Sequence, residues 1–266
     1  MDNLRSRIIT ISRGFIFGAT LILGAFLSVE QLDDGNVNNF LELCLIMVGV
    51  LFIEIFTSNQ LRTKPLIEPS SKQDVFLHHI LLPSTTYLSI LGFTYFNRQT
   101  EIRLIVMSLG LFMFTVLFIN IRAHYLSNMV LYTNTNYIYD VLKLLLFFLA
   151  SNTVFHLVAS FGGFLFLIFP LVVFGLTLLF VVRYEKLDWF GMRYIFALPV
   201  IITLVALSGL ITGITPIQNT LVTFLSFYLG LAILHHILHR DMNKTLLLEY
   251  LVIFAIALVT VYSMNA

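Results

Sequence analysis

The feature of this sequence that most restricts its fold is a series of long apolar segments. The hydrocarbon core of a bilayer is about 30 Å thick, and a helix needs roughly twenty apolar residues to cross it. Nine segments of about this length follow one another, at 10–29, 40–56, 75–96, 104–121, 137–159, 161–182, 192–214, 221–238 and 245–263. We therefore predict an all-α, polytopic integral membrane protein with about nine transmembrane helices.

The composition favours the same class. Apolar residues make up 59% of the chain and charged residues only 11%, whereas shares of about 50% and about 25% are usual. The mean hydropathy is +0.94. Because lipid offers no hydrogen-bond partner to the backbone, and the segments lack the alternation of barrel strands, we expect helices.

The distribution of lysine and arginine predicts the orientation. If the N-terminus is cytoplasmic, thirteen of the fifteen basic residues fall on the cytoplasmic side, and only Arg98 and Arg103 fall outside. The first outer loop carries Glu30, Asp33 and Asp34 and no basic residue. The positive-inside rule thus predicts a multi-pass protein of the cell membrane, with a cytoplasmic N-terminus and an external C-terminus.

Two connections affect the predicted boundaries. A continuous helix through 159–163 would be far longer than one span, so the pair Gly162 and Gly163 predicts a tight outer turn. Without that turn the count falls to eight spans. The segment 122–136 is expected to be a cytoplasmic connection, and part of it has the composition of a short interfacial helix.

The chain shows no separate soluble domain, so we expect residues 1–266 to form a single transmembrane domain. An internal echo matches Leu82-Pro83 with Leu198-Pro199, and Leu109-Gly110-Leu111 with Leu229-Gly230-Leu231. This pattern predicts a parallel repeat of 10–121 and 137–239, followed by a final helix at 245–263. The alternative is chance, because leucine is abundant throughout the chain.

Six of the seven histidines are predicted at cytoplasmic helix ends. His235 and His239 are four residues apart, so one helical face presents both imidazoles. Further ligands are sought among His78, His79, His124, Asp140, Asp241 and Glu54. Such a set predicts a zinc site, or a site for two iron ions if most of it converges. The alternative is that these histidines lie at headgroup level without a metal.

The other polar residues in the apolar segments have simple structural explanations. Glu54, Asp140, Lys143 and Glu249 lie near cytoplasmic helix ends, where they are expected to reach water, and Asp140 and Lys143 have the spacing of a helical ion pair. The run Ser84 to Thr86 follows Pro83. We expect these hydroxyls to bond to carbonyls of their own helix; lining a polar cavity is the alternative.

Three function classes remain. The net charge of +1 argues against a nucleic-acid partner, and the sequence has no GxSxG, P-loop or Rossmann pattern. The uniformly apolar helices favour a membrane-embedded packing or assembly protein, with membrane lipids and another membrane protein as partners. The alternatives are a carrier of lipids or small amphiphiles, and a metal-dependent enzyme that modifies lipids at a cytoplasm-facing histidine site.

Overall fold

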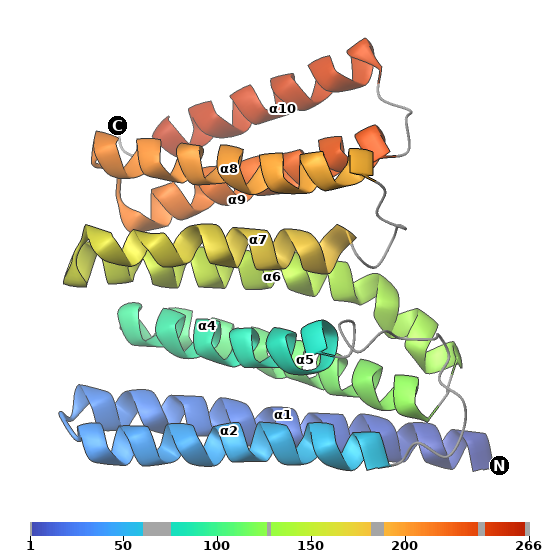
Figure 1. Ribbon diagram of the computed structural model, residues 1–266. Helices are drawn as coiled ribbons and strands as arrows, with labels where there is room; N and C mark the ends of the chain where they lie inside the picture. Colours follow the sequence, from blue (N-terminus) through green and yellow to red (C-terminus); the bar gives the residue numbers. More distant parts are fainter. Residues whose placement is uncertain (1, 61–75, 127–128, 182–188, 239–242, 264–266) are drawn as a thin grey trace. The chain divides into compact units, whose positions relative to one another are not determined.

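The computed structural model describes residues 2–60, 76–126, 129–181, 189–238 and 243–263, and every regular element in these ranges is helical (Figure 1). The predicted all-α fold is therefore confirmed. The chain divides into two compact units, residues 1–142 and 143–266, and the boundary lies within helix α6 (Met129–Phe161). The single transmembrane domain and the parallel repeat stay predictions.

The described residues include six helices that are long and apolar enough to cross a membrane. They span Arg7–Asp33, Val37–Ser58, Thr100–Tyr125, Ile138–Phe161, Ile195–Thr212 and Pro216–Leu238. Two shorter apolar stretches cover Gly163–Leu179 and Leu247–Ile256. The protein is thus a multi-span helical membrane protein, and the count of nine spans stays a prediction.

Unit 1, residues 1–142, is organised around its first helix. Its elements are α1 (Asp2–Asp33), α2 (Val37–Gln60), the π-helix η1 (Phe76–Leu81), α4 (Leu82–Phe96), α5 (Thr100–Tyr125) and the first part of α6. Helix α1 packs against α2, α4 and α5. Gly35, with φ of 78°, lies in the turn between α1 and α2, where its lack of a side chain permits the left-handed backbone.

Two glycines bring α1 and α5 close together. A Cβ atom placed on Gly14 would lie 3.2 Å from the carbonyl oxygen of Thr115, and one on Gly18 would lie 3.2 Å from Cβ of Phe114. The two glycines are four residues apart on one face of α1, the spacing of the GxxxG motif that lets membrane helices approach closely. Dispersion contacts between the two backbones therefore stabilise this pair of helices.

The irregular start of the third predicted segment follows from its proline. Pro83 lies in the first turn of α4, directly after η1. Its ring would collide with the carbonyl of His79 in a regular α-helix, and the wider π-helical turn avoids this collision. The hydroxyls of Thr85 and Thr86 donate to the carbonyls of Leu81 and Leu82, as predicted for helix-bonded rather than cavity-lining groups.

Unit 2, residues 143–266, has an aromatic core. It contains the rest of α6, the 3₁₀ helix η2 (Gly163–Leu167), α7 (Ile168–Val181), α8 (Trp189–Thr212), α9 (Pro216–Leu238) and α10 (Lys244–Ser263). Phe147 of α6 stacks on Phe227 of α9 with ring centroids 4.0 Å apart, and both side chains are fully buried. Such stacked aromatic pairs bury a large apolar area in the core.

The two uncertain connections have different outcomes. The turn predicted at 159–163 is confirmed, because α6 ends at Phe161 and Gly162 has a φ of 117°. The connection predicted at 122–136 was wrong at both ends, since α5 continues to Tyr125 and α6 begins at Met129. Its polar residues look like a loop in sequence, but they extend α6 by about two turns.

A polar contact fixes α8 against α9. Asn219 of α9 is fully buried, and its Nδ2 donates to the backbone carbonyl of Ala206 in α8 across 3.1 Å. The same side chain occupies the space beside Gly209, where a Cβ atom would collide with Oδ1 of Asn219. The small residue on α8 is therefore what allows the amide to cross between the two helices.

Candidate functional site

Charged and polar side chains gather at one end of unit 1, which we call the polar end and define as Arg13, Glu54, Thr57, His79, Arg122, His124 and Tyr125. They come from the start of α1, the end of α2, η1 and the end of α5. The opposite end of the unit carries an ion pair of its own. There Asp33 lies 2.9 Å from Arg103 and 3.5 Å from Arg98.

The polar end contains an ion pair between α1 and α2. Nε of Arg13 donates to Oε2 of Glu54 across 2.9 Å, and Nη2 of Arg13 donates to Thr57 across 2.9 Å. Glu54 is only 1% exposed. The prediction that Glu54 reaches water was therefore wrong, because the carboxylate is held inside the unit by its arginine partner.

Arg122 lies beside this pair, one turn before the end of α5. Its side chain is close enough to Arg13 and Glu54 to interact electrostatically with both. The residue is 8% exposed, and its Nε and Nη1 atoms have no hydrogen-bond partner within the described part of the chain. A buried guanidinium thus lies next to a carboxylate that already pairs with another arginine.

Two of the predicted ligand residues meet at the polar end. The rings of His79 and His124 lie 5.3 Å apart, and both side chains are buried. Nδ1 of His79 and the hydroxyl of Tyr125 share a hydrogen bond of 2.9 Å, in which the histidine tautomer decides which group donates. Tyr132 of α6 also packs against His124, at 5.6 Å between ring centroids.

The remaining predicted ligands are distributed over the chain. His235 is exposed near the end of α9, and its ring lies 5.8 Å from that of His236. Asp140 is half-buried in α6, in unit 1. His78 is one of the residues of η1. His239 and Asp241 lie outside the described residues.

The metal site stays a prediction. Among the described side chains, no group of three or more histidine, cysteine, aspartate or glutamate residues lies close enough to hold a metal ion. His235 belongs to unit 2, whereas His79 and His124 belong to unit 1. The predicted approach between these two sets, with zinc or iron between them, is therefore not tested.

Lys143 is another residue whose burial the sequence did not indicate. It was expected to extend to water, but it is fully buried, and its Nζ donates to the carbonyl of Leu179 across 2.8 Å. Leu179 lies in the last turn of α7, where carbonyls have no partner within the helix. The lysine therefore stabilises the end of α7. Glu249 is exposed, and its contact with water stays a prediction.

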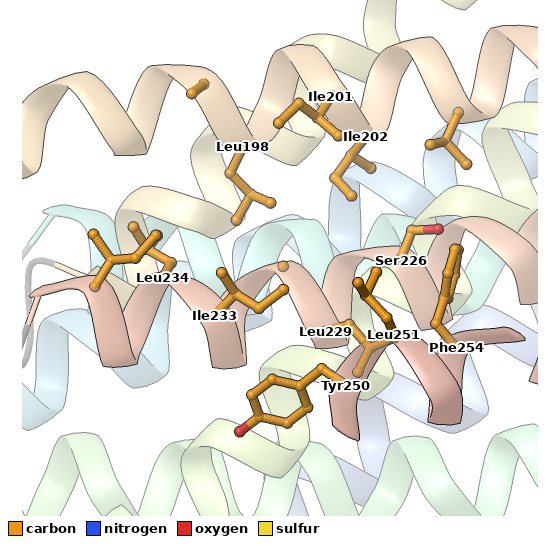
Figure 2. A pocket seen from close by; sticks show the side chains of 14 residues that line it. Leu198, Ile201, Ile202, Ser226, Leu229, Ile233, Leu234, Tyr250, Leu251 and Phe254 are labelled. Carbon is orange, nitrogen blue, oxygen red and sulfur yellow. The ribbon is translucent and has the colours of Figure 1, made fainter. Parts of the chain in front are cut away.

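Unit 2 contains an apolar pocket between α8, α9 and α10. Figure 2 shows its wall, formed by Leu198, Ile201, Ile202, Ser226, Leu229, Ile233, Leu234, Tyr250, Leu251 and Phe254, among others. The cavity volume is about 290 Å³, near the lower end of the ~300–1,000 Å³ typical of small-molecule sites. Apart from Ser226 and Tyr250, the lining side chains are aliphatic or aromatic, so the pocket suits a hydrocarbon ligand.

Sequence reasoning missed this pocket, although one signal was available. Gly230 of α9 faces Leu198 of α8, and a Cβ atom on this glycine would collide with the leucine side chain. Both residues belonged to the internal echo in the sequence, where they were compared with their counterparts in the first half rather than with each other. Comparisons with protein-family models, curated proteins and solved structures found no match for this chain.

Proposed function

We propose that the protein binds lipids or small amphiphiles within the membrane, as a carrier does, and that the pocket of unit 2 holds their apolar chain. The observation that carries this proposal is the pocket itself, about 290 Å³ lined by residues of α8, α9 and α10. A carrier needs such a cavity to hold the apolar part of its ligand. The packing or assembly class has no comparable feature to support it.

The chemistry of the wall indicates the ligand. A hydrocarbon chain requires no hydrogen bonds, and the aliphatic wall offers almost none. An unfilled space between helices would lose dispersion contacts along its whole lining, and an acyl or isoprenoid chain restores them. Ser226 does not change this preference, because its hydroxyl donates to the carbonyl of Val222 in its own helix.

The surroundings of the pocket provide a source of such chains. Helix α10, which forms one wall, exposes large apolar side chains outside the lining, including Leu248, Ile253 and Ile256. In a bilayer these side chains face lipid tails, so hydrocarbon is the solvent next to the pocket. Membrane lipids are accordingly the partners that we expect first.

The orientation is part of the proposal. With a cytoplasmic N-terminus, the polar end of unit 1 is cytoplasmic and the end with Asp33 is external. Arg98 and Arg103, the two exceptions to the positive-inside distribution, both pair with Asp33. The proposed orientation rests on the other thirteen basic residues, which fall on the side that it makes cytoplasmic.

The test is photo-crosslinking with a phospholipid that carries a diazirine in its acyl chain. We expect cross-links to peptides of α8, α9 and α10. Ala197 lines the pocket and is itself exposed, so Ala197→Phe inserts a ring into the cavity with little disturbance of the helix. Ile211→Phe on the same helix is the matched control, because Ile211 is 77% exposed and lies outside the lining.

Ala197→Phe should lose most of the pocket cross-links, and Ile211→Phe should keep them. Equal labelling of both variants at the same peptides would mean that the probe samples the lipid-facing surface rather than the pocket. Absence of cross-links to the pocket lining in the unaltered protein would also overturn the proposal.

A further inference from the structure

Among the described residues, the polar end of unit 1 carries two arginines, Arg13 and Arg122, but only one carboxylate, Glu54. Arg122 is 8% exposed, and two of its three side-chain nitrogens have no acceptor among the described residues. Glu54, the carboxylate beside it, already accepts a hydrogen bond from Arg13. Among the described residues of the polar end, two guanidinium groups therefore share one carboxylate, which leaves an excess of one positive charge within this set.

A third arginine adds to this imbalance. Arg7 lies on α1, about 9 Å before Arg13 along the helix axis. Its Nε is buried and also has no hydrogen-bond partner within the described ranges. The start of α1 and the end of α5 thus both supply donors whose acceptor is not part of the described protein.

The burial of Arg122 needs an explanation because it departs from the usual behaviour of arginine. A long basic side chain near a membrane surface normally extends to water. A buried, uncompensated charge carries a large desolvation penalty, which an anion of opposite charge removes. Arg122 can therefore offer two hydrogen-bond donors to an anionic ligand.

The depth of Arg122 indicates which anion is available. The candidate span of α5 ends at Tyr125, so Arg122 lies roughly 4.5 Å inside that end. At this level the common anion is the phosphate group of lipids, and a soluble phosphate can reach the same position from the aqueous side. Guanidinium groups bind phosphate through charge-assisted hydrogen bonds, often two at once.

We propose that Arg122, together with Arg13, binds a phosphate group at the polar end of unit 1. The ligand is the headgroup of an anionic phospholipid or a free phosphate. The site is independent of the pocket proposed above, since it lies in the other unit and rests on charge rather than on apolar volume.

The experiment measures the thermal unfolding of the full-length protein in a maltoside detergent, which contains no phosphate. One arm adds phosphatidic acid, and its reference adds diacylglycerol with the same acyl chains. The second arm adds inorganic phosphate, and its reference adds chloride at equal ionic strength. A ligand that binds only the folded protein raises the unfolding temperature, so titration of each ligand yields an affinity.

Arg122→Gln tests the position of the site. We expect this variant to weaken phosphate binding about ten- to a hundredfold, the usual effect of losing a charge-assisted hydrogen bond. Arg103→Gln is the matched control, because Arg103 lies on the same helix at the opposite end and pairs with Asp33. The control should bind phosphate as the unaltered protein does.

A second measurement covers the case in which Arg122→Gln fails to fold. Hydrogen exchange of the unaltered protein should show slower exchange of amides near the end of α5 when phosphatidic acid is added, but not when diacylglycerol is added. The same protection at α8 to α10 instead would place the phosphate elsewhere and overturn the proposal.

The outcomes separate the two sources of phosphate. A shift with phosphatidic acid alone identifies a lipid headgroup, and a shift with inorganic phosphate identifies a soluble anion. The proposal is wrong if neither arm shows a phosphate-dependent shift, or if Arg122→Gln and the unaltered protein bind equally. Ala197→Phe, which fills the pocket of unit 2, should leave the phosphate-dependent shift unchanged, so the two proposals can fail separately.

Discussion

Arg13 donates a hydrogen bond to Glu54 across 2.9 Å, and this ion pair joins two helices at residues 41 positions apart in the sequence. Glu54 is 1% exposed, whereas the side chain of Arg13 is 33% exposed. The pair therefore lies partly inside unit 1, where an ionised group that loses its partner is costly.

We expect Glu54→Gln to destabilise the protein by about 3 kcal/mol, the lower end of the range for breaking a buried ion pair, because Arg13 keeps some contact with water. The neutral amide removes the one carboxylate that lies beside both Arg13 and Arg122 among the described residues. The measurement is denaturant unfolding of the purified protein in detergent. Glu249→Gln removes an exposed carboxylate from α10 and should have little effect; similar losses in both variants would contradict this role of Glu54.

The contact between α1 and α5 gives a second prediction. Gly18→Leu introduces a side chain where a Cβ atom already lies 3.2 Å from Cβ of Phe114 and 3.3 Å from the backbone nitrogen of Thr115. Because a backbone cannot move aside as a flexible side chain can, we expect a loss of about 3 kcal/mol or more from overpacking.

Gly49→Leu provides the control for Gly18→Leu. Gly49 lies within α2, and apart from its chain neighbours and the backbone of its own helix no described atom lies within 4 Å of the position where its Cβ would be. Removing a glycine from a helix interior should then be neutral or slightly stabilising, by about 0.5 kcal/mol. If the unfolding transitions of the two variants are displaced equally, helix propensity rather than the α1–α5 contact decides the outcome.

Asn219 gives a third prediction, in unit 2. Asn219→Ala removes the hydrogen bond to the carbonyl of Ala206, and we expect a loss of about 1 kcal/mol, typical of polar contacts between membrane helices. The readout is again the unfolding transition in detergent. Ser208→Ala is the reference, since the exposed Ser208 hydroxyl donates only within its own helix, to Val205. A smaller loss for Asn219→Ala than for Ser208→Ala would exclude a stabilising role of this contact.

The helices could be predicted from the sequence because the length and apolar composition of each segment indicate a membrane helix without knowledge of its neighbours. The turn at Gly162 could be predicted for the same reason, since a glycine pair interrupts an otherwise continuous segment. The start of α6 at Met129 could not, because asparagine and threonine favour turns, and tyrosine is enriched at the membrane interface.

The polar end was less accessible to sequence reasoning. The Arg13–Glu54 pair joins distant positions, and Arg122 looked like a basic loop residue because it closes an apolar segment. Burial by neighbouring helices, which no local pattern encodes, decides whether such a residue meets water or a partner. The Gly14–Gly18 spacing was the available clue, since it brings α1 against α5 and thus Arg13 near Arg122.

The last prediction is that α4, together with η1, crosses the membrane. Although α4 has only 15 residues, it continues η1, and the helical stretch Phe76–Phe96 is roughly 30 Å long. Its first part carries His79, at the polar end. Arg98, just beyond its last residue, pairs with Asp33 at the opposite end. We therefore expect this stretch to be a full membrane crossing.

Cysteine labelling with a membrane-impermeant maleimide tests this crossing in a Cys44→Ser background. Asn36 follows α1 and Gln99 precedes α5, and both are exposed. If α4 crosses the membrane, Asn36→Cys and Gln99→Cys react from the same side, and the distribution of basic residues predicts that this side is external. Reaction from opposite sides would show that α4 does not cross. Reaction of both only from the cytoplasm would keep the crossing but reverse the orientation.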